Sequence, residues 1–304
     1  MTLRIATRGS KLALWQAEHV RARLLSLQAD IKIELVILKT QGDKILDVAL
    51  AKVGGKGLFV KEIEDALLEN SADLAVHSMK DVPSELPEGL GLAAILERED
   101  PRDAFLSTKI ASLQALPQGA TLGTSSLRRA AQILAWRPDI KIELLRGNVD
   151  TRLAKLDEGR YDAILLAAAG LKRLGLGHRI TSILDLDCMI PAVGQGAVGV
   201  ECRLTDDKIV ELIRRLNHDD TSVCVLAERE FNSAIGGSCQ IPAGCHARIV
   251  AGSFHLDAFI ASPNGAKLLR RSRSGPVAEL RGSGAKLAAE LLDAGGRQLL
   301  AQIL

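Results

Sequence analysis

The segment at residues 73–83 has the residue types and order of a strand that ends in reactive side chains. Its sequence, DLAVHSMKDVP, runs from a short apolar stretch into a serine, a lysine and an aspartate. Such a stretch is typical of a strand buried in a parallel sheet, and Pro83 marks where regular pairing ends. Ligands of α/β proteins bind at the carboxyl edge of the sheet, so Lys80 and Asp81 are candidate site residues. A surface ion pair beside a turn is the alternative interpretation.

Arginines and small hydroxyl residues recur at predicted junctions between strands and helices. Amides and hydroxyls at a helix start bind anions, and a neighbouring arginine can clamp a carboxylate or phosphate through two hydrogen bonds. One such arginine is usually just solvated, but six at similar positions predict a solvated cleft for a ligand with several negative groups. The residues are Arg8, Ser10, Thr124, Ser126, Arg128, Arg129, Arg146, Arg152 and Arg173. Lys52 and Lys56, in a glycine-rich loop, either extend this set or belong to a flexible lid.

Asp81 would be an isolated carboxylate among these cations. Neighbouring cations favour the ionised form of a carboxyl group, so Asp81 suits the stabilisation of positive charge better than the donation of a proton. Cys239 lies in a glycine-containing loop, where a thiol is accessible and cations favour the thiolate; a buried, inert thiol is the alternative. His77 lacks the partner spacing of a catalytic triad or a metal site, so we interpret it as structural.

The composition limits the classes of protein to which the chain can belong. With 304 residues, 47% of them hydrophobic and 25% charged, it has the length for two or three globular domains. A net charge of +2 and 3% aromatic residues disfavour nucleic-acid binding, and no nucleotide-binding motif is present. Five cysteines without C-x-x-C or zinc spacing indicate free thiols and no metal. No signal peptide or membrane span is recognisable, so we expect a cytoplasmic protein.

The order of predicted elements indicates two similar α/β lobes with a hinged cleft and a smaller C-terminal α+β domain. A strand at residues 3–8 followed by a helix is echoed by the segment 120–129. The charged segment 97–103 and the glycine-rich segment 191–197 are interpreted as two crossings between the lobes, which implies a hinge. From Thr221 onward, grouped strands and helices indicate an α+β unit. We expect domain 1 at residues 1–97 and 198–217, domain 2 with an arginine-rich cleft wall at 102–192, and domain 3 at 220–304.

Several longer segments resemble the porphobilinogen deaminase family, and the resemblance covers nearly the whole chain. They are ATRGS at 6–10, KVGGKGLFVKE at 52–62, ADLAVHSMKDVP at 72–83, EREDPRDAF at 97–105, GTSSLRR at 123–129, LRGNV at 145–149 and PAVGQGA at 191–197. The resemblance implies two lobes similar to periplasmic binding proteins and a third domain that carries a cofactor cysteine. It implies a transferase that joins four porphobilinogen molecules head to tail, with loss of ammonia, into hydroxymethylbilane for porphyrin and haem biosynthesis.

The resemblance also implies a cofactor and the residues that serve it. The cofactor is dipyrromethane, held by a thioether to Cys239, and Asp81 matches the catalytic aspartate. That carboxylate would hold pyrrole N–H groups and stabilise the azafulvenium cation left when ammonia departs. Each pyrrole carries an acetate and a propionate, which accounts for the many cations. Matching cofactor or substrate contacts are Arg8, Ser10, Lys52, Lys56, Ser78, Lys80, Thr124, Ser126, Arg128, Arg129, Arg146, Arg152 and Arg173, of which Arg8, Arg146 and Arg152 are nearest to substrate handling.

The chain departs from the family around the attachment cysteine. The family commonly has Glu-Gly-Gly-Cys, whereas residues 236–239 read GGSC. Residues 239–242, CQIP, match the family pattern, but Cys245 stays an alternative attachment site. We expect a monomer that binds neither nucleic acid nor membranes and passes its product to uroporphyrinogen-III synthase. A non-catalytic anion-binding protein with the same cleft is the rival hypothesis.

Overall fold

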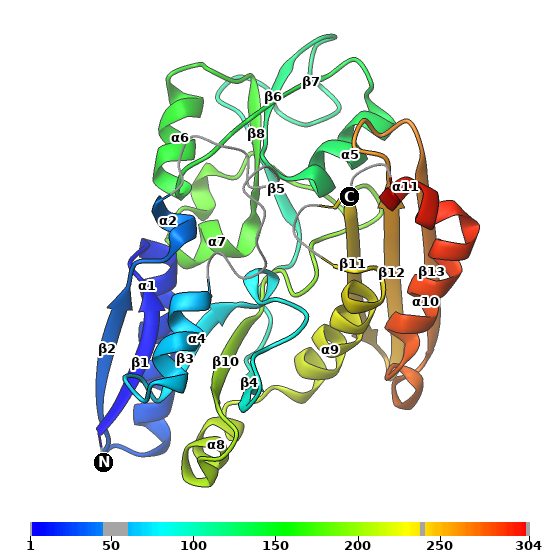
Figure 1. Cartoon of the computed structure of the whole chain (residues 1–304). Coiled ribbons are helices and arrows are strands. Elements are labelled where there is room, and N and C mark those ends of the chain that lie inside the picture. Colours follow the sequence, from blue (N-terminus) through cyan, green and yellow to red (C-terminus); the bar gives the residue numbers. More distant parts are fainter. Residues whose placement is uncertain (1, 45–59, 238–240, 302–304) are drawn as a thin grey trace.

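The structure, a computed structural model, describes residues 2–44, 60–237 and 241–301. These residues form two α/β lobes, one built mainly from the N-terminal part of the chain and one from the middle, with a C-terminal domain beside them (Figure 1). Lys52, Lys56 and Cys239 lie outside the described residues.

Lobe 1 is built on a five-stranded sheet with the order β2-β1-β3-β10-β4. Its strands are β1 (Thr2–Arg8), β2 (Lys32–Leu38), β3 (Leu74–Ser78), β4 (Leu90–Ile95) and β10 (Val198–Arg203). Its helices are α1 (Lys11–Leu27), α2 (Gln41–Lys44), α4 (Lys61–Leu68) and α8 (Asp207–Arg214). β3 runs parallel to β1 but antiparallel to β10, so the sheet is mixed rather than parallel. The reason is that β10 enters this sheet from the other lobe, through the second crossing.

Lobe 2 repeats this plan with the order β7-β6-β8-β5-β9. Its strands are β5 (Asp103–Leu106), β6 (Thr121–Gly123), β7 (Lys141–Glu143), β8 (Ala163–Ala167) and β9 (Ser182–Ile183). Its helices are α5 (Leu127–Trp136), α6 (Val149–Asp157) and α7 (Ala168–Arg173), followed by a 3-10 turn at Gly177–Arg179. Here β5 is the antiparallel strand that arrives through a crossing. The two similar lobes expected from the sequence are therefore confirmed, although β5 itself was interpreted only as the end of a crossing.

The C-terminal domain is a three-stranded antiparallel sheet packed against helices. The sheet contains β11 (Ala243–Val250), β12 (Ser253–Ala261) and β13 (Leu268–Pro276). The helices are α9 (Asp219–Ala234), α10 (Ser283–Leu291) and α11 (Arg297–Ala301), with a 3-10 turn at Val277–Glu279 and a π turn at Leu292–Gly296. Phe231, Leu256 and Leu287 are buried at the centre. β11 and β12 join through Ala251 and Gly252, which both have positive φ, as a two-residue hairpin turn requires.

The two crossings lie side by side and form the hinge. The amide of Glu99 donates to the carbonyl of Gly196 at 3.1 Å. Gly196 has a φ of +88°, and a Cβ at this position would lie 2.4 Å from the carbonyl oxygen of Glu99. Only glycine therefore fits here. The hinge inferred from the sequence thus consists of two closely packed, irregular segments.

No helix in the described part of the chain is both long and apolar enough to span a membrane.

Candidate active site

Asp81 lies in a rigid turn at the carboxyl end of the central strand of lobe 1. β3 is followed by the 3-10 turn Met79–Asp81. The amide of Met79 donates to the carbonyl of Ala197 at 3.0 Å, and a Cβ on Gly194 would lie 2.7 Å from the Cβ of Met79. The second crossing therefore packs directly against this turn. That packing supports the backbone of the turn from which the Asp81 side chain extends.

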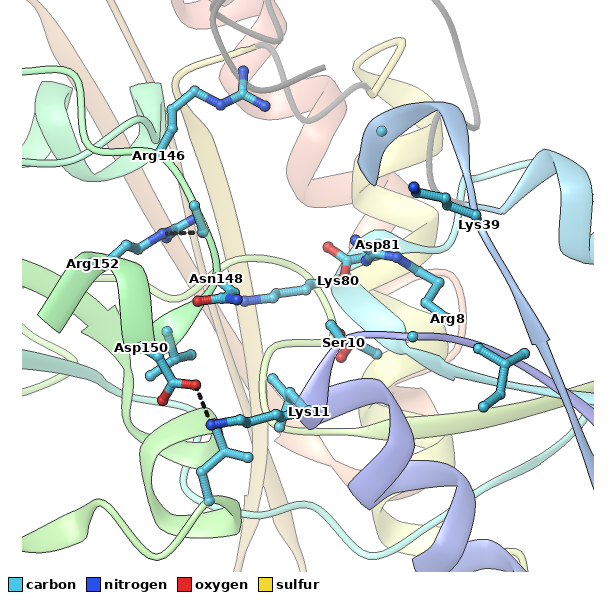
Figure 2. Close-up of a pocket in the computed structure, with 18 of the residues that line it drawn as sticks. Arg8, Ser10, Lys11, Lys39, Lys80, Asp81, Arg146, Asn148, Asp150 and Arg152 are labelled. Atoms are coloured by element: carbon cyan, nitrogen blue, oxygen red, sulfur yellow. Dashed lines mark hydrogen bonds and ion pairs between the residues drawn. The ribbon is translucent and has the colours of Figure 1, made fainter. Parts of the chain in front are cut away.

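A cavity of about 700 Å³ lies between the lobes, and Asp81 is one of its lining residues (Figure 2). Lobe 1 contributes Arg8, Ser10, Ser78 and Lys80, and lobe 2 contributes Arg146 and Arg152. Figure 2 shows Asp81 beside Arg8 and Lys80, with Arg152 and Arg146 on the opposite wall. The structure therefore brings these seven predicted residues together. It adds four charged or amide side chains that the sequence did not suggest, namely Lys11, Lys39, Asn148 and Asp150.

Two helix starts border the cavity. The hydroxyl of Ser10 accepts from the amide of Ala13 at 3.3 Å, which caps α1. The side chain of Asn148 accepts from the amide of Thr151 at 2.9 Å, which caps α6. Because the amino end of a helix carries partial positive charge, both helices favour anionic groups in the cavity. The cap at Asn148 was missed, although Asn directly before a helical pattern is a recognisable N-cap signal.

The charges around Asp81 act on one another. Burial lowers the pKa of Lys80, and the nearby Asp81 carboxylate opposes this shift. Burial, followed by repulsion from Arg129 and Arg146, lowers the pKa of Arg152 to about 10, and Asp81 again opposes the shift. Arg152 therefore stays protonated at neutral pH. A carboxylate within a cluster of cations suits a ligand that carries several carboxylates and one developing positive charge.

Ser78 and Thr124 have structural partners. Gln16 of α1 donates to the hydroxyl of Ser78 at 2.8 Å, one helix turn beyond the cavity rim. Gln16 is buried, and it orients the strand end from which the Asp81 turn begins. In the sequence, Gln16 stands out only as a polar residue directly before Ala17, which is buried in α1. Thr124 is buried and accepts from the amide of Ser126, whose own hydroxyl caps α5.

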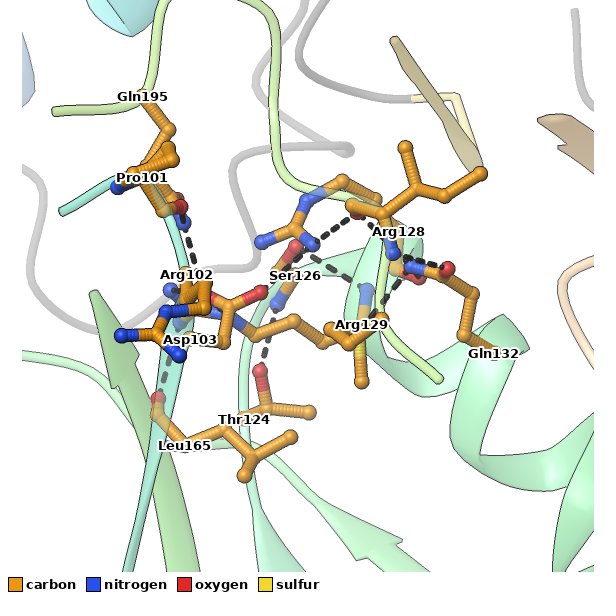
Figure 3. Close-up of polar contacts among 12 residues, drawn as sticks. Pro101, Arg102, Asp103, Thr124, Ser126, Arg128, Arg129, Gln132, Leu165 and Gln195 are labelled. Carbon is orange, nitrogen blue, oxygen red and sulfur yellow. Dashed lines mark hydrogen bonds and ion pairs between the residues drawn. The ribbon is translucent and has the colours of Figure 1, made fainter. Parts of the chain in front are cut away.

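Arg128 and Arg129 are both buried rather than solvated, which differs from the expected solvated cleft wall, while their contacts with cofactor or substrate stay predictions (Figure 3). Both guanidinium groups are buried against Asp103, at 2.7 Å each, and this pairing holds the pKa of that carboxyl well below its usual range despite its burial. Arg128 also donates to the carbonyl of Ile190, and Gln195 donates to Asp103. The reason is β5, which places Asp103 inside lobe 2.

Arg129 and Arg173 lie nearer the site than Arg128 does. Arg129 lines a small hollow next to the cavity together with Lys80, Arg152 and Arg173. Arg173 donates to the carbonyl of Gly196 in the second crossing at 2.7 Å. Arg129 therefore braces the inside of lobe 2 through Asp103, and Arg173 joins lobe 2 to the hinge.

Cys245, the alternative attachment residue, is inaccessible. It lies on β11 with 0% exposure, and burial raises the pKa of its thiol well above the usual value. Burial also raises the pKa of Cys202 to about 11 and that of Cys224 to about 12. Such thiols are poor nucleophiles. Cys188 is exposed, and it lies in lobe 2 rather than in the C-terminal domain.

Solved structures that match part of this chain include a periplasmic domain and two binding proteins. The periplasmic VFT2 domain of BvgS from Bordetella pertussis is 15% identical over 71% of this chain and 86% of that one, with a TM-score of 0.41. A putative methionine-binding lipoprotein from Bacillus subtilis is 11% identical over 71% and 90%, with a TM-score of 0.45. The alkanesulfonate-binding protein SsuA from Xanthomonas axonopodis is 14% identical over 76% and 73%, with a TM-score of 0.40. Nothing about the ligand of this chain follows from them.

Two family matches together span most of the sequence. Residues 3–211 match the dipyromethane cofactor binding domain of porphobilinogen deaminase. Residues 222–293 match the C-terminal domain of the same enzyme. The matched ranges include Asp81, the residues that line the cationic cavity, and Cys239. The chain therefore belongs to the porphobilinogen deaminase family, whose members polymerise porphobilinogen into hydroxymethylbilane with a dipyrromethane cofactor.

Proposed function

We propose that porphobilinogen units are joined in the cavity between the lobes, with Asp81 as the catalytic carboxylate. The observation that carries this proposal is the position of Asp81, which lies in a rigid turn beside Arg8 and Lys80 and opposite Arg152. Each substrate brings two carboxylates, which the cations bind, and an amine that leaves as ammonia. The fixed Asp81 carboxylate stabilises the positive charge that develops as ammonia departs.

The same cavity fits dipyrromethane, whose two pyrroles carry four carboxylates and two N–H groups. When bound, the cofactor supplies the free pyrrole carbon to which the first substrate is joined. Arg8, Arg146 and Arg152, with the helix starts at Ser10 and Asn148, hold carboxylates. Asp81 accepts hydrogen bonds from pyrrole N–H groups. Ser78, Lys80, Thr124, Ser126, Arg129, Arg173 and, by sequence alone, Lys52 and Lys56 complete the proposed set, in which Arg128 acts as a support.

We further propose that Cys239 carries the cofactor through a thioether. The burial of Cys202, Cys224 and Cys245 supports this choice, because a thioether forms only on a thiol that the pyrroles can reach. The described chain ends at Gly237 and resumes at Ile241, at the base of β11. Next to this base, a Cβ on Gly244 would lie 3.2 Å from Cδ of Arg128. Arg128 thus supports the segment that leads to the attachment loop.

The proposed enzyme is a hydroxymethylbilane synthase that acts as a monomer. That it acts in the cytoplasm and passes hydroxymethylbilane to uroporphyrinogen-III synthase are proposals that rest on the family.

The intact mass of the purified protein, followed by peptide mapping, tests this assignment. The expected result is a mass excess of two linked pyrroles on the peptide that contains Cys239, and none on the same peptide of Cys239→Ala. Added porphobilinogen should then release ammonia. An excess on Cys245 would contradict the attachment site. An unmodified protein that releases no ammonia even after incubation with porphobilinogen would favour the anion-binding hypothesis.

A further inference from the structure

Helix α1 of lobe 1 reaches across the mouth of the cavity to lobe 2. Nζ of Lys11, the first residue of α1, lies 2.6 Å from Oδ2 of Asp150 in α6 (Figure 2). This ion pair joins the lobes at a place where the chain does not cross between them. Neither residue was suggested by the sequence.

A second contact between the lobes lies one turn further along α1. Cζ of Arg173, in α7, lies 5.5 Å from the ring centre of Trp15, and Trp15 stacks on His19 with 5.1 Å between ring centres. Leu12 approaches Gly170 of α7, where a Cβ would lie in ordinary contact at 3.5 Å. Residues 11, 12, 15 and 19 share one face of a helix. α1 therefore presents a continuous face to lobe 2.

The cavity is too small for the complete product chain, which bears on the contacts between α1 and lobe 2. Its roughly 700 Å³ lies within the range of about 300–1,000 Å³ that is usual for one small ligand. The growing chain ends as four pyrrole units attached to two more from the cofactor. If it grows in this cavity, as proposed above, the lobes must separate about the hinge to make room. The α1 contacts, which lie outside the hinge, must then break.

We propose that this face of α1 is a latch that holds the lobes together during the first additions and opens for the later ones. Lys11, Trp15 and their partners Asp150 and Arg173 act as positioning residues, since they set the separation of the lobes. The side chains of Lys11 and Asp150 are 74% and 44% exposed. An ion pair this exposed is weak and readily broken, as a reversible latch requires.

A reversible cross-link tests the latch directly. The holoenzyme carries Lys11→Cys and Asp150→Cys in a Cys188→Ser background, because Cys188 is an exposed thiol. A short bis-methanethiosulfonate reagent joins the two new thiols through disulfides, which a reductant removes without cleaving a thioether. The protein is mixed with excess porphobilinogen, and intact mass counts the added units.

The cross-linked protein should stop before four additions, and reductant should restore complete synthesis. Completion of all four additions at the same rate with and without the cross-link would overturn the latch. A protein that adds no unit in either form, although the parent chain does, would show that the substitutions rather than the cross-link block the reaction, and would also overturn it. Failure of the parent chain to add any unit would overturn the proposed function.

Single charge variants give an independent test. Lys11→Gln and Asp150→Asn each break the pair, so both should raise the rate of the last addition relative to the first by about two- to fivefold. Lys32→Gln is the matched control, because Lys32 pairs with Glu34 at the same 2.6 Å and with similar exposure, but within lobe 1. It should leave the ratio unchanged. Opposite effects of Lys11→Gln and Asp150→Asn would contradict the latch and indicate a carboxylate-binding role for Lys11.

Discussion

The two lobes share one sheet order but place their carboxylates differently. In lobe 1, β10 begins with Val198, which lies opposite Ser78 at the end of β3. Asp81, in the turn that follows β3, lines the cavity. In lobe 2, the equivalent strand β5 begins with Asp103 opposite Ala167. This carboxylate pairs with Arg128 and Arg129, and it holds Arg128 inside lobe 2. The turn after β3 thus presents a carboxylate to the cavity in lobe 1, whereas the first residue of β5 supplies a buried carboxylate that braces lobe 2.

The lobes also differ in how they compensate buried charge. Two guanidinium groups neutralise Asp103, and its pKa is lowered. In lobe 1, Glu64 of α4 is buried and pairs with no guanidinium group among the described residues. Burial, together with repulsion from Glu201, raises its pKa to about 7. Nε2 of His77 lies 2.9 Å from Glu201, in keeping with the structural interpretation of His77. Lobe 2 therefore derives stability from its buried acid, whereas lobe 1 tolerates a cost.

Asp81→Asn should have the largest effect on function. Loss of the fixed negative charge should lower turnover by about 100- to 10,000-fold, because nothing then stabilises the developing positive charge. The melting temperature and the mass of the attached cofactor should stay as in the parent chain. Single-turnover ammonia release and intact mass measure the two effects. Near-normal turnover would remove the functional contrast between Asp81 and Asp103.

Asp103→Asn should have the largest effect on stability. It leaves two buried guanidinium groups without their anion, at a cost of about 3–5 kcal/mol in the free energy of unfolding. Denaturant unfolding measures this loss. Asp139→Asn is the control, because Asp139 pairs with Arg137 at the surface of the same lobe and should change the midpoint little. Equal losses in the two variants would contradict the bracing role.

Arg128→Leu should lower stability by about 3 kcal/mol and impair cofactor attachment, because the guanidinium joins Asp103, the Ile190 carbonyl and the base of β11. Arg152→Leu is the contrasting variant. It should raise KM by about tenfold with little change in melting temperature, since it removes one carboxylate clamp from the cavity. The comparison would fail if Arg128→Leu raised KM at unchanged stability.

Glu64→Gln should have the smallest effect, and that effect should depend on pH. The pKa of Glu64 is 4.5 in the unfolded chain and about 7 in the folded protein. Because the folded state then binds a proton that the unfolded state has lost, the protein becomes less stable as the pH rises from 4.5 through about 7. The variant lacks this loss, so at pH 8 it should be more stable by about 1–2 kcal/mol, because water screens part of the shift. Near pH 4.5 the two proteins should match. Unfolding midpoints across this range decide the matter; a difference independent of pH would show that the raised pKa is not the cause.

The sequence predicted those features that depend on short stretches of chain. The strand before Asp81, the echo between the lobes and the two crossings all follow from local patterns, and the structure shows them. Strand β5 escaped because it has only four residues and begins with a charged one. The ion pair between Lys11 and Asp150 was not predicted, because nothing in the residues around either one indicates that the two lie close together.

The sequence by itself predicted the three-part organisation and supplied the candidate site residues, because strand ends, helix starts and motifs are encoded by neighbouring residues. Only the tertiary structure decided which arginines face the cavity. Arg128 meets Asp103 across 25 positions and Ile190 across 62. Whether a guanidinium binds a ligand or a buried carboxylate depends on which distant segment folds against it. The role of such an arginine therefore depends on tertiary packing and cannot be derived from its neighbours in the sequence.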